Sequence, residues 1–381
     1  MSDSKSAVGG TDGSAGGPYR VMVVDDSAVI RGLLTRALEK DSFIKVVASV
    51  GNGEAAIKAL DRHDIEVIIL DIEMPVMDGL TALPKLLAAK PGVQVIMAST
   101  LTRKNAEVSL RALQAGAADY LPKPSSTSEL TGADAFQREL LEKVKALAKA
   151  ARPNRPEVTA RGADADAQAS AASLQPKRTI TLRKASSVLP RIIAIGSSTG
   201  GPQALLEVLR DMAAGIKLPI LIAQHMPATF TTLLAEHIER ATGVPCAEGK
   251  DGEVISAGRI YLAPGNYHMV VERDGAGSVI RLNQDPPENF CRPAVDPMLR
   301  SMARIYGAGL LTIILTGMGS DGQKGATEVV QAGGTVIAQD EATSVVWGMP
   351  GAVATSGLCS AVLPVKEIGP SVRKLVMRSA A

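Results

Sequence analysis

A serine flanked by glycines follows an apolar segment near the middle of the chain. The stretch reads IIAIGSSTGGPQALLEVL, residues 192–209, and contains the pattern G-x-S-x-G at Gly196, Ser198 and Gly200. Glycines on both sides of a serine allow a tight strand-to-helix turn that exposes the hydroxyl group. Pro202 suits the first turn of a helix whose N-terminus would offer free N–H groups to a developing oxyanion. The pattern predicts a nucleophilic serine.

Two other interpretations of this stretch remain, a phosphate-binding turn and a plain strand-to-helix corner. The phosphate-binding interpretation is weakened because the stretch has no P-loop lysine and no complete G-x-G-x-x-G, and no acid follows at the spacing of a dinucleotide-binding fold.

A nucleophilic serine needs a base, and the chain contains only four histidines. His225 follows the apolar run PILIAQ, so we expect it at the carboxyl end of the next strand, beside Ser198. The other three suit this role less well. His237 lies in LLAEHIER, which is typical of a helix surface, His268 heads a strand, and His63 belongs to the N-terminal part of the chain.

The base needs an acid that orients it, and Asp321 is our candidate. It stands in LLTIILTGMGSDGQKGA, residues 310–326, where a strongly apolar run ends in a glycine-rich turn. Such a turn could bring Asp321 to the same edge as Ser198 and His225, although the residue could instead cap the next helix. Three other acids compete for the role, but none closes so apolar a run: Asp251, Asp285 and Asp296.

A second group of polar residues follows the apolar runs of the N-terminal third. Asp25 and Asp26 close the first run, Asp71 the third, and Ser99 and Lys123 the fourth and fifth. Three carboxylates at one edge of a sheet repel one another, by roughly 4 kcal/mol for two charges about 4 Å apart, and a hard cation such as Mg²⁺ would relieve this. The set suits phosphorylation of Asp71, with Ser99 and Lys123 binding the product. Acidic helix caps on a solvated rim are the alternative.

The segments that must position these residues alternate strand and helix patterns. In the N-terminal third, five short β-branched runs alternate with five helical patterns. This alternation predicts a five-stranded, parallel, doubly wound sheet of the flavodoxin-like type. The alternation resumes after residue 188 and predicts a second doubly wound α/β domain, with an antiparallel insertion over residues 244–284. The predicted boundaries are a disordered tail (1–18), a first domain (19–140), a helix end and flexible linker (141–188) and a second domain (189–378).

Composition limits the classes of partner. The chain has 381 residues, a net charge of +2 and only 3% aromatic residues, so neither nucleic acid nor an anionic membrane surface is an expected partner. Three widely spaced cysteines indicate neither a disulfide framework nor a zinc site. No signal peptide and no membrane-length apolar run is present, so we expect a cytoplasmic protein without membrane insertion.

The N-terminal motifs VVDDSAVIR, ILDIEMPVMDGL, MAST and ADYLPKP resemble the receiver domain of bacterial response regulators. The resemblance covers residues 19 to about 140. It implies that Asp71 accepts a phosphoryl group, that Asp25 and Asp26 bind Mg²⁺ with it, and that Ser99 and Tyr120 form the switch pair. It also implies a chemotaxis sensor histidine kinase as the phosphodonor.

The later motifs AIGSSTGGPQAL, AQHMP, YLAPGNYHM, CRPAVD and LTGMGSDG resemble the catalytic domain of the chemotaxis protein-glutamate methylesterase/protein-glutamine glutaminase family. The resemblance implies Ser198 as nucleophile, His225 as base, Asp321 as its partner, the Met318 N–H in the oxyanion hole and Thr199 in the site. The implied reaction is hydrolysis of glutamyl methyl esters, and deamidation of glutamines, on the cytoplasmic helices of methyl-accepting chemoreceptors. No cofactor is implied in this domain.

The order of the two domains leads us to expect that an unphosphorylated receiver covers the catalytic edge. Ser197 departs from the family pattern, in which alanine is frequent, and places a second hydroxyl beside Ser198. Two other functions compete: a DNA-binding regulator, for which the second domain lacks a helix-turn-helix signature, and a phosphorylation-controlled binding module in which Ser198 is only structural.

Overall fold

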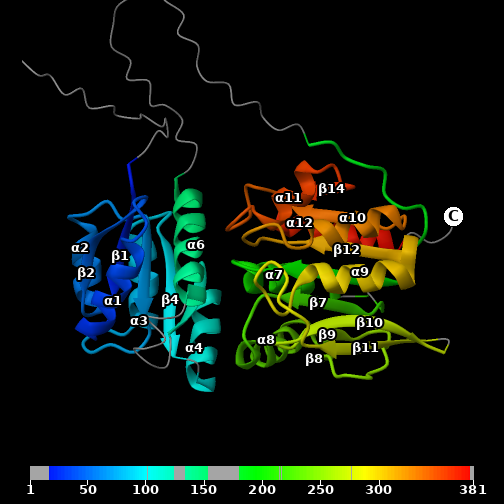
Figure 1. Ribbon diagram of the computed structural model, residues 1–381, viewed down its shortest axis with the longest axis horizontal. Helices are drawn as coiled ribbons and strands as arrows, with labels where there is room; N and C mark the ends of the chain where they lie inside the picture. The colour runs from blue at the N-terminus through cyan, green and yellow to red at the C-terminus, as the bar shows by residue number, and fades with distance from the viewer. Residues whose placement is uncertain are drawn as a thin grey trace, which may run out of the picture.

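The chain forms two α/β domains that lie side by side (Figure 1). The computed structural model describes residues 17–100, 102–123, 134–152, 180–213, 215, 217–275 and 277–377. The predicted tail before residue 17 and the linker between 153 and 179 lie outside the described residues. We refer to the two units as the N-terminal domain, which ends with helix α6, and the C-terminal domain.

The N-terminal domain is a five-stranded parallel sheet with the strand order β2-β1-β3-β4-β5. This confirms the predicted flavodoxin-like sheet, whose ligands bind beyond the carboxyl ends of its strands. The strands are β1 (Tyr19–Val24), β2 (Ile44–Val50), β3 (Val67–Asp71), β4 (Gln94–Thr100) and β5 (Asp119–Lys123). The helices are α1 (Ala28–Leu38), α2 (Gly53–Leu60), α3 (Gly79–Ala89), α4 (Arg103–Gln114) and α6 (Asp134–Ala151).

Short polar side chains start the helices of this domain immediately after its acidic loops. The hydroxyl of Ser27 accepts the N–H of Ile30 at the start of α1, and Asp78 accepts the N–H of Thr81 at the start of α3. Such caps satisfy N–H groups that have no partner within the helix. They leave the strand-end acids Asp25 and Asp71 available at the edge of the sheet.

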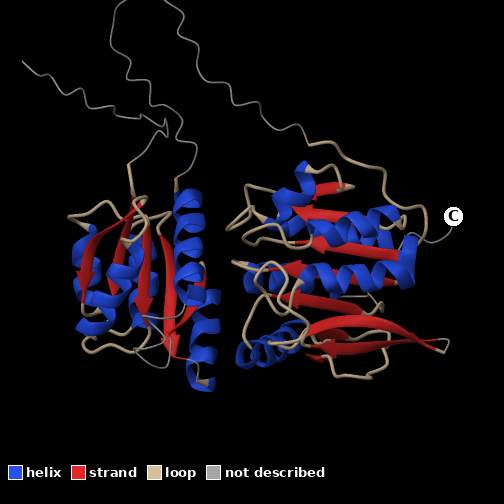
Figure 2. Cartoon of the chain, viewed as in Figure 1, coloured by secondary structure: helices blue, strands red, loops and turns tan. Residues whose placement is uncertain are grey.

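The C-terminal domain is built on a seven-stranded sheet in which every pair of neighbours is parallel (Figure 2). Its order is β14-β13-β12-β6-β7-β9-β8. The strands are β6 (Ile192–Ser197), β7 (Ile220–Gln224), β8 (Cys246–Glu248), β9 (Ile260–Leu262), β12 (Leu310–Ile314), β13 (Thr335–Gln339) and β14 (Ala361–Leu363). The helices are α7 (Gly201–Ala213), α8 (Ala228–Thr242), α9 (Val295–Tyr306), α10 (Gln323–Gln331), α11 (Met349–Thr355) and α12 (Val365–Val376), with a short 3-10 turn η1 (Gly307–Gly309).

The antiparallel part of this domain is smaller than the sequence predicted. Among the strands that the structure describes, β10 (His268–Asp274) and β11 (Gly277–Asn283) form an antiparallel hairpin that packs beside α9, and an isolated antiparallel bridge joins Val254 to Val279 of β11. Strands β8 and β9, which the prediction placed in the insertion, extend the main sheet in parallel with β7. The prediction was wrong there because these strands have only three residues each, too few to reveal their partners.

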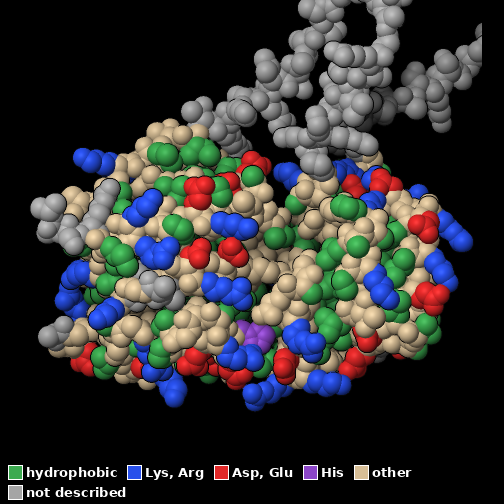
Figure 3. Space-filling view, turned by 180° about the vertical axis from the view of Figure 1, so that it is seen from behind, with side chains coloured by type: hydrophobic (Ala, Val, Ile, Leu, Met, Phe, Trp, Pro, Cys, Tyr) green, Lys and Arg blue, Asp and Glu red, His purple; other side chains and the backbone are tan. Residues whose placement is uncertain are grey.

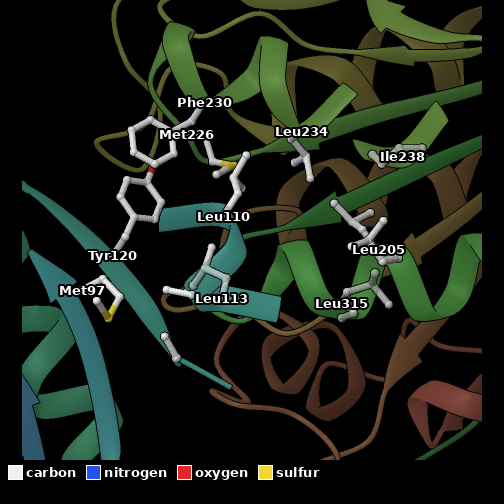
Figure 4. Close-up of a cluster of buried hydrophobic side chains, with 14 of the residues drawn as sticks. Met97, Leu110, Leu113, Tyr120, Leu205, Met226, Phe230, Leu234, Ile238 and Leu315 are labelled. Atoms are coloured by element: carbon white, nitrogen blue, oxygen red, sulfur yellow. The ribbon is translucent and has the colours of Figure 1, made fainter. Parts of the chain in front are cut away.

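Apolar side chains from both domains meet in one buried cluster (Figure 4). Leu110 and Leu113 of α4 and Tyr120 of β5 face Met226 and Phe230 of the C-terminal domain. The two domains therefore share a packed apolar interface.

Charged side chains of both signs are interspersed over the face seen in Figure 3, with no broad area of one sign. Among the described residues, no helix is long and apolar enough to cross a membrane.

Candidate active site

Three neighbouring strands of the C-terminal sheet carry the predicted catalytic side chains at their carboxyl ends. Ser198 directly follows β6, His225 directly follows β7, and Asp321 lies in the turn between β12 and α10. Strand β6 lies between β12 and β7. The strands β7 to β9, which come next in the chain, lie on one side of it, and the later strands β12 to β14 lie on the other. Such a switch in strand order opens a crevice where ligands bind in α/β folds.

The two adjacent serines have different surroundings. Ser197 is fully buried, and its hydroxyl donates to Oε1 of Gln224 at 2.6 Å. Ser198 is partly exposed and lines a cavity. Its backbone is fixed by its N–H donating to the carbonyl of Thr316 (3.0 Å) and by Nε2 of Gln224 donating to its carbonyl (2.9 Å). The structure therefore presents the second serine, and not the first, to the cavity.

Glycines permit the close packing of backbone around Ser198. Gly200 has a φ of 75°, in the left-handed region that few side chains tolerate. A Cβ atom at Gly317 would lie 2.9 Å from the Cβ atom of Ser198 and 2.4 Å from Sδ of Met349. The turn after β12 can therefore approach the serine only because residue 317 has no side chain.

His225 and Asp321 form a direct pair, with 2.7 Å between Nε2 of the imidazole and Oδ2 of the carboxylate. Asp321 is almost fully buried, and three backbone N–H groups also donate to it, from Val295 (2.6 Å), Asp296 (3.0 Å) and Gly322 (2.9 Å). The first two begin helix α9, whose N-terminus favours a negative charge. The carboxylate is thus fixed in position and orients the imidazole.

The pair stabilises its charged form. Burial lowers the pKa of His225, but the Cys291 sulfur and the Asp321 carboxylate outweigh burial and raise this pKa to about 10. Burial would raise the pKa of Asp321, yet His225 and the backbone N–H donors lower it. Of these two groups, Asp321 has its pKa lowered, and its Oδ2 lies 2.7 Å from Nε2 of the imidazole. We therefore attribute the direction of the His225 shift to Asp321.

Three residues beside this pair were not predicted as part of the site. The sequence presents Asp296 only as a competitor of Asp321 and Cys291 only as one of three widely spaced cysteines, and it does not point to Asn289. The Asn289 side chain donates to both Asp321 (2.9 Å) and Asp296 (3.2 Å), and Cys291 contacts His225. The only sequence signal was the family motif CRPAVD, residues 291–296, which carries two of the three.

The remaining histidines of the C-terminal domain are structural. His268 is buried, contacts the Pro286 carbonyl through Nε2 at 3.2 Å, and accepts the N–H of Ala294 at 3.2 Å. His237 corrects the prediction of a helix-surface residue, because it is 9% exposed and lies 3.4 Å from Nε2 of Gln114 in the other domain. Its helix, α8, looked solvent-facing only because the domain that covers it is distant in sequence.

A cavity of about 880 Å³ joins these residues to the N-terminal domain. Ser198, Thr199, His225, Met318 and Asp321 line one side. The other side comes from strand β5 and helix α6: Asp119, Tyr120, Arg138, Glu139, Glu142, Lys143, Lys145 and Ala146. The N-terminal domain therefore forms one wall of the candidate active site.

Direct bonds between the domains lie beside Ser198. The hydroxyl of Thr199 donates to Oδ2 of Asp119 at 2.6 Å, and both side chains are buried. Lys143 lies 3.2 Å from the same carboxylate oxygen and donates to the carbonyl of Tyr120 at 2.7 Å. The Tyr120 ring stacks on the Phe230 ring with 4.2 Å between their centroids. Strand β5 thus presents consecutive residues, an acid and an aromatic ring, to the C-terminal domain (Figure 4).

Helix α7 adds a polar contact to this interface. Nε2 of Gln203 donates to the carbonyl of Leu113 (2.8 Å), in the last turn of α4, and to that of Ala117 (2.7 Å), in the loop after this helix. The Leu113 carbonyl also accepts the N–H of Gly116. Gln203 thus connects α7 to the end of α4 across the domain interface.

The acidic residues of the N-terminal domain also meet as predicted from their strand ends. Oxygen atoms of Asp25, Asp26 and Asp71 lie within 4.8 Å of one another. Lys123 pairs with Asp25 at 2.5 Å and with Asp71 at 2.7 Å. Ser99 is buried at the end of β4, and its hydroxyl lies 3.1 Å from that of Ser109. Burial raises the pKa of Asp71 despite Lys123. Three carboxylates with one lysine suit a hard divalent cation such as Mg²⁺.

Comparisons with known families match both domains. The family model "Response regulator receiver domain" matches residues 21–133, and the model "CheB methylesterase" matches residues 193–372. Among solved structures, the Thermotoga maritima CheB methylesterase catalytic domain aligns with 50% of this chain and 100% of its own, at 40% identity and a TM-score of 0.48.

Full-length relatives extend the match over the whole chain. The protein-glutamate methylesterase/protein-glutamine glutaminase of group 2 operon from Rhodospirillum centenum is 61% identical over 100% of both chains. The protein-glutamate methylesterase/protein-glutamine glutaminase of Azospirillum brasilense is 61% identical over 97% of this chain and 95% of its own. The chain therefore belongs to the protein-glutamate methylesterase/protein-glutamine glutaminase family, with a response regulator receiver domain preceding its CheB methylesterase domain.

Proposed function

We propose that this protein hydrolyses glutamyl methyl esters on the cytoplasmic helices of methyl-accepting chemoreceptors, through Ser198, His225 and Asp321. One observation carries the proposal: a partly exposed serine lies in the same cavity as a histidine whose Nε2 is 2.7 Å from a buried carboxylate. This arrangement is the one that activates a serine hydroxyl for acyl transfer, whatever the order of the residues in the chain.

The residues would act in two steps. Nε2 of His225 is bonded to Asp321, so Nδ1 takes the proton as Oγ of Ser198 attacks the ester carbonyl. The same proton passes to the leaving methoxy oxygen, and methanol departs from an acyl-enzyme. A water molecule then attacks the acyl carbon, gives its proton to His225 and releases Ser198 and the glutamate carboxylate. Asp321 stays ionised and holds the imidazolium in both steps.

The oxyanion is assigned to the turn after β12. The N–H of Met318 belongs to the turn that Gly317 packs against Ser198, so it is positioned near the attacked carbonyl. The hydroxyl of Thr199 follows the nucleophile in the chain and is a second candidate donor once it leaves Asp119. The same machinery accepts a glutamine amide, with ammonia leaving instead of methanol, which accounts for a glutaminase activity.

The decisive experiment measures methanol release from methylated receptor by the purified protein and by the Ser198→Ala variant. Release by the first and none by the second supports the proposal. A folded wild-type protein that binds methylated receptor but releases no methanol under any condition would leave a binding module in place of an enzyme.

Phosphorylation of Asp71 is the proposed switch. Asp25, Asp26 and Asp71 would hold Mg²⁺, which neutralises phosphoryl oxygens during transfer, while Lys123 and Ser99 bind the phosphorylated carboxyl. A chemotaxis sensor histidine kinase is the proposed phosphodonor. Asp119 of the docked N-terminal domain accepts the Thr199 hydroxyl, and this domain forms one wall of the cavity. Displacing the domain would therefore open the site to a receptor helix.

This switch is tested with an Asp71→Asn protein and a small phosphodonor. The variant should keep the basal methanol release of the wild type and lose its stimulation by phosphodonor. Full stimulation in the variant would refute the role of Asp71 while leaving the esterase reaction intact.

A further inference from the structure

A second buried carboxylate, that of Asp296, and the side-chain amide of Asn289 lie beside the His225–Asp321 pair. Asp296 is 1% exposed, as is Asp321, and both are within hydrogen-bonding distance of Nδ2 of Asn289, at 3.2 Å and 2.9 Å. An amide nitrogen carries two hydrogens, so one Asn289 side chain can donate to both acids at once. The two carboxyl groups also face each other directly, and burial and the charge of Asp321 raise the pKa of Asp296. A shared hydrogen-bond donor offsets part of the cost of two neighbouring buried charges.

The two acids also fix two helices to each other. Asp321, which precedes α10, accepts the first N–H groups of α9, from Val295 and Asp296. Asp296, within α9, accepts the N–H of Gly325 in the first turn of α10 at 2.7 Å through Oδ1. The start of α9 is therefore bonded to the acid that precedes α10, and the first turn of α10 to an acid of α9. The Asn289 amide donates to Oδ2 of Asp296 and to Oδ1 of Asp321, which also accepts the N–H groups of Asp296 and Gly322.

The backbone at Asn289 is held in an uncommon conformation. Its φ is 51°, and that of Phe290 is 62°, so two consecutive non-glycine residues adopt positive φ. Such a conformation is unfavourable for most residues other than glycine and least so for asparagine and aspartate. Both residues line the cavity. The loop directs the Asn289 amide to the two carboxylates, while Phe290 is 73% exposed and its ring lies under the Arg138 guanidinium of the N-terminal domain.

We infer that Asn289 is a positioning residue for ester hydrolysis: its amide ties Asp321 to Asp296, so that Oδ2 of Asp321 faces His225. This inference rests on the proposed function of Ser198 and His225. Asn289 is not assigned contact with the substrate, because its amide hydrogens are both directed to the carboxylates. Its removal should therefore reduce kcat, with KM nearly unchanged.

The test compares three variants of the full-length protein under saturating phosphodonor. Asn289→Gly tolerates the positive φ and removes both donations, so kcat should fall on the order of 10-fold or more at every pH. Asn289→Asp keeps the shape but donates a hydrogen bond only when its new carboxyl group is protonated. Its deficit relative to the wild type should therefore grow as the pH rises. Phe290→Gly, at the neighbouring positive-φ position, controls for changes in the loop and in the cavity wall, because Phe290 lines the cavity and contacts Arg138. It adds no titratable group, so its pH profile should keep the wild-type shape whatever its kcat.

Other titratable groups that face this point are present in every variant, so they are common to all of these profiles. They are His225, Cys291, Asp296 and Asp321, with Glu288 beyond them in its pair with Arg300.

A readout that does not depend on turnover separates this inference from the proposed function. The proton shared by His225 and Asp321 should give a low-field NMR resonance in the wild type and in Phe290→Gly, and it should shift or broaden in Asn289→Gly. If the wild type releases no methanol, the proposed function fails, and the resonance still reports whether Asn289 orients Asp321. An unchanged resonance with a kcat within twofold of the wild type in Asn289→Gly would overturn the inference. A lower melting temperature with an unchanged kcat would show a purely structural residue.

Discussion

The two adjacent serines at the carboxyl end of β6 differ in their surroundings, and this difference decides their chemistry. Ser197 is buried and bonded to Gln224, whereas Ser198 lines the cavity. We expect Ser198→Ala to lower the rate of methanol release by about 10³-fold or more, because no other hydroxyl can replace the nucleophile. The matched variant Ser197→Ala should keep most of the activity and lose about 1 kcal/mol of unfolding free energy with its hydrogen bond. Both are measured by methanol release and denaturant unfolding. An equally large loss of activity in both variants would contradict the assignment of Ser198 alone as the nucleophile.

The charge on Asp321 sets the pH at which His225 can act. A base must be neutral, and contact with Asp321 raises the pKa of His225 above its ordinary value of 6.5. The acid limb of the kcat/KM profile should therefore lie above pH 6.5 in the wild type. In Asp321→Asn, the raising charge is lost while burial still lowers the pKa, so the limb should move to lower pH. The maximal rate should fall by about 10³- to 10⁴-fold. An acid limb at the same pH in both proteins would show that Asp321 does not control this titration.

At the scale of elements, the turn after β12 must pass close to the nucleophile. We expect Gly317→Ala to reduce methanol release by at least about 10-fold, because its Cβ would overlap Met349 and press on Ser198. The same substitution at Gly32, inside α1 with open space around it, should instead stabilise the protein by up to about 1 kcal/mol. Activity and thermal unfolding of the two variants check the contrast. An active Gly317→Ala protein would show that the turn can move away.

The strands and their chemistry could be predicted because continuous apolar runs end abruptly in polar residues. In a parallel sheet such ends share one edge, so the acids of β1 and β3 were expected to meet, as were Ser198 and His225. The meeting of Asp25, Asp26 and Asp71 and the His225–Asp321 bond are of this kind. The roles of these residues in the reaction stay predictions.

Other features depend on contacts between segments distant in sequence and left no local pattern. β8 and β9 are too short to reveal their parallel partners, and β14 was not predicted because its three residues show no strand pattern. His237 is buried by its contact with the other domain, in which its neighbour Gln114 lies 123 residues away along the chain. The role of Asn289 could not be predicted, because it depends on a loop conformation with positive φ. Asparagine adopts this conformation more readily than most residues, but an asparagine in a sequence does not by itself indicate it.

At the scale of the whole molecule, Asp119 connects the domains at the point nearest the nucleophile. We expect Asp119→Ala to raise methanol release in the absence of phosphodonor several-fold and to reduce the additional stimulation by phosphodonor. The reason is that Thr199 loses its partner across the interface, and Lys143 loses one of its two acids. The exposed Asp61, at the end of α2, offers a matched control in Asp61→Ala, which should behave as the wild type. Low basal release with full stimulation in Asp119→Ala would show that this contact does not hold the domains together.

The shared wall of the cavity also links the two halves of the molecule in the reverse direction. If a phosphoryl group on Asp71 favours an open cavity, then thermodynamic reciprocity requires that a ligand in the cavity favour the phosphorylated N-terminal domain by the same factor. Under the proposed function, a methylated receptor helix would therefore act as an effector of the N-terminal domain as well as a substrate. In a cell, abundant methylated receptor would then prolong the active state of the enzyme. Depletion of the methylated receptor would let the two domains close again and would end the stimulation.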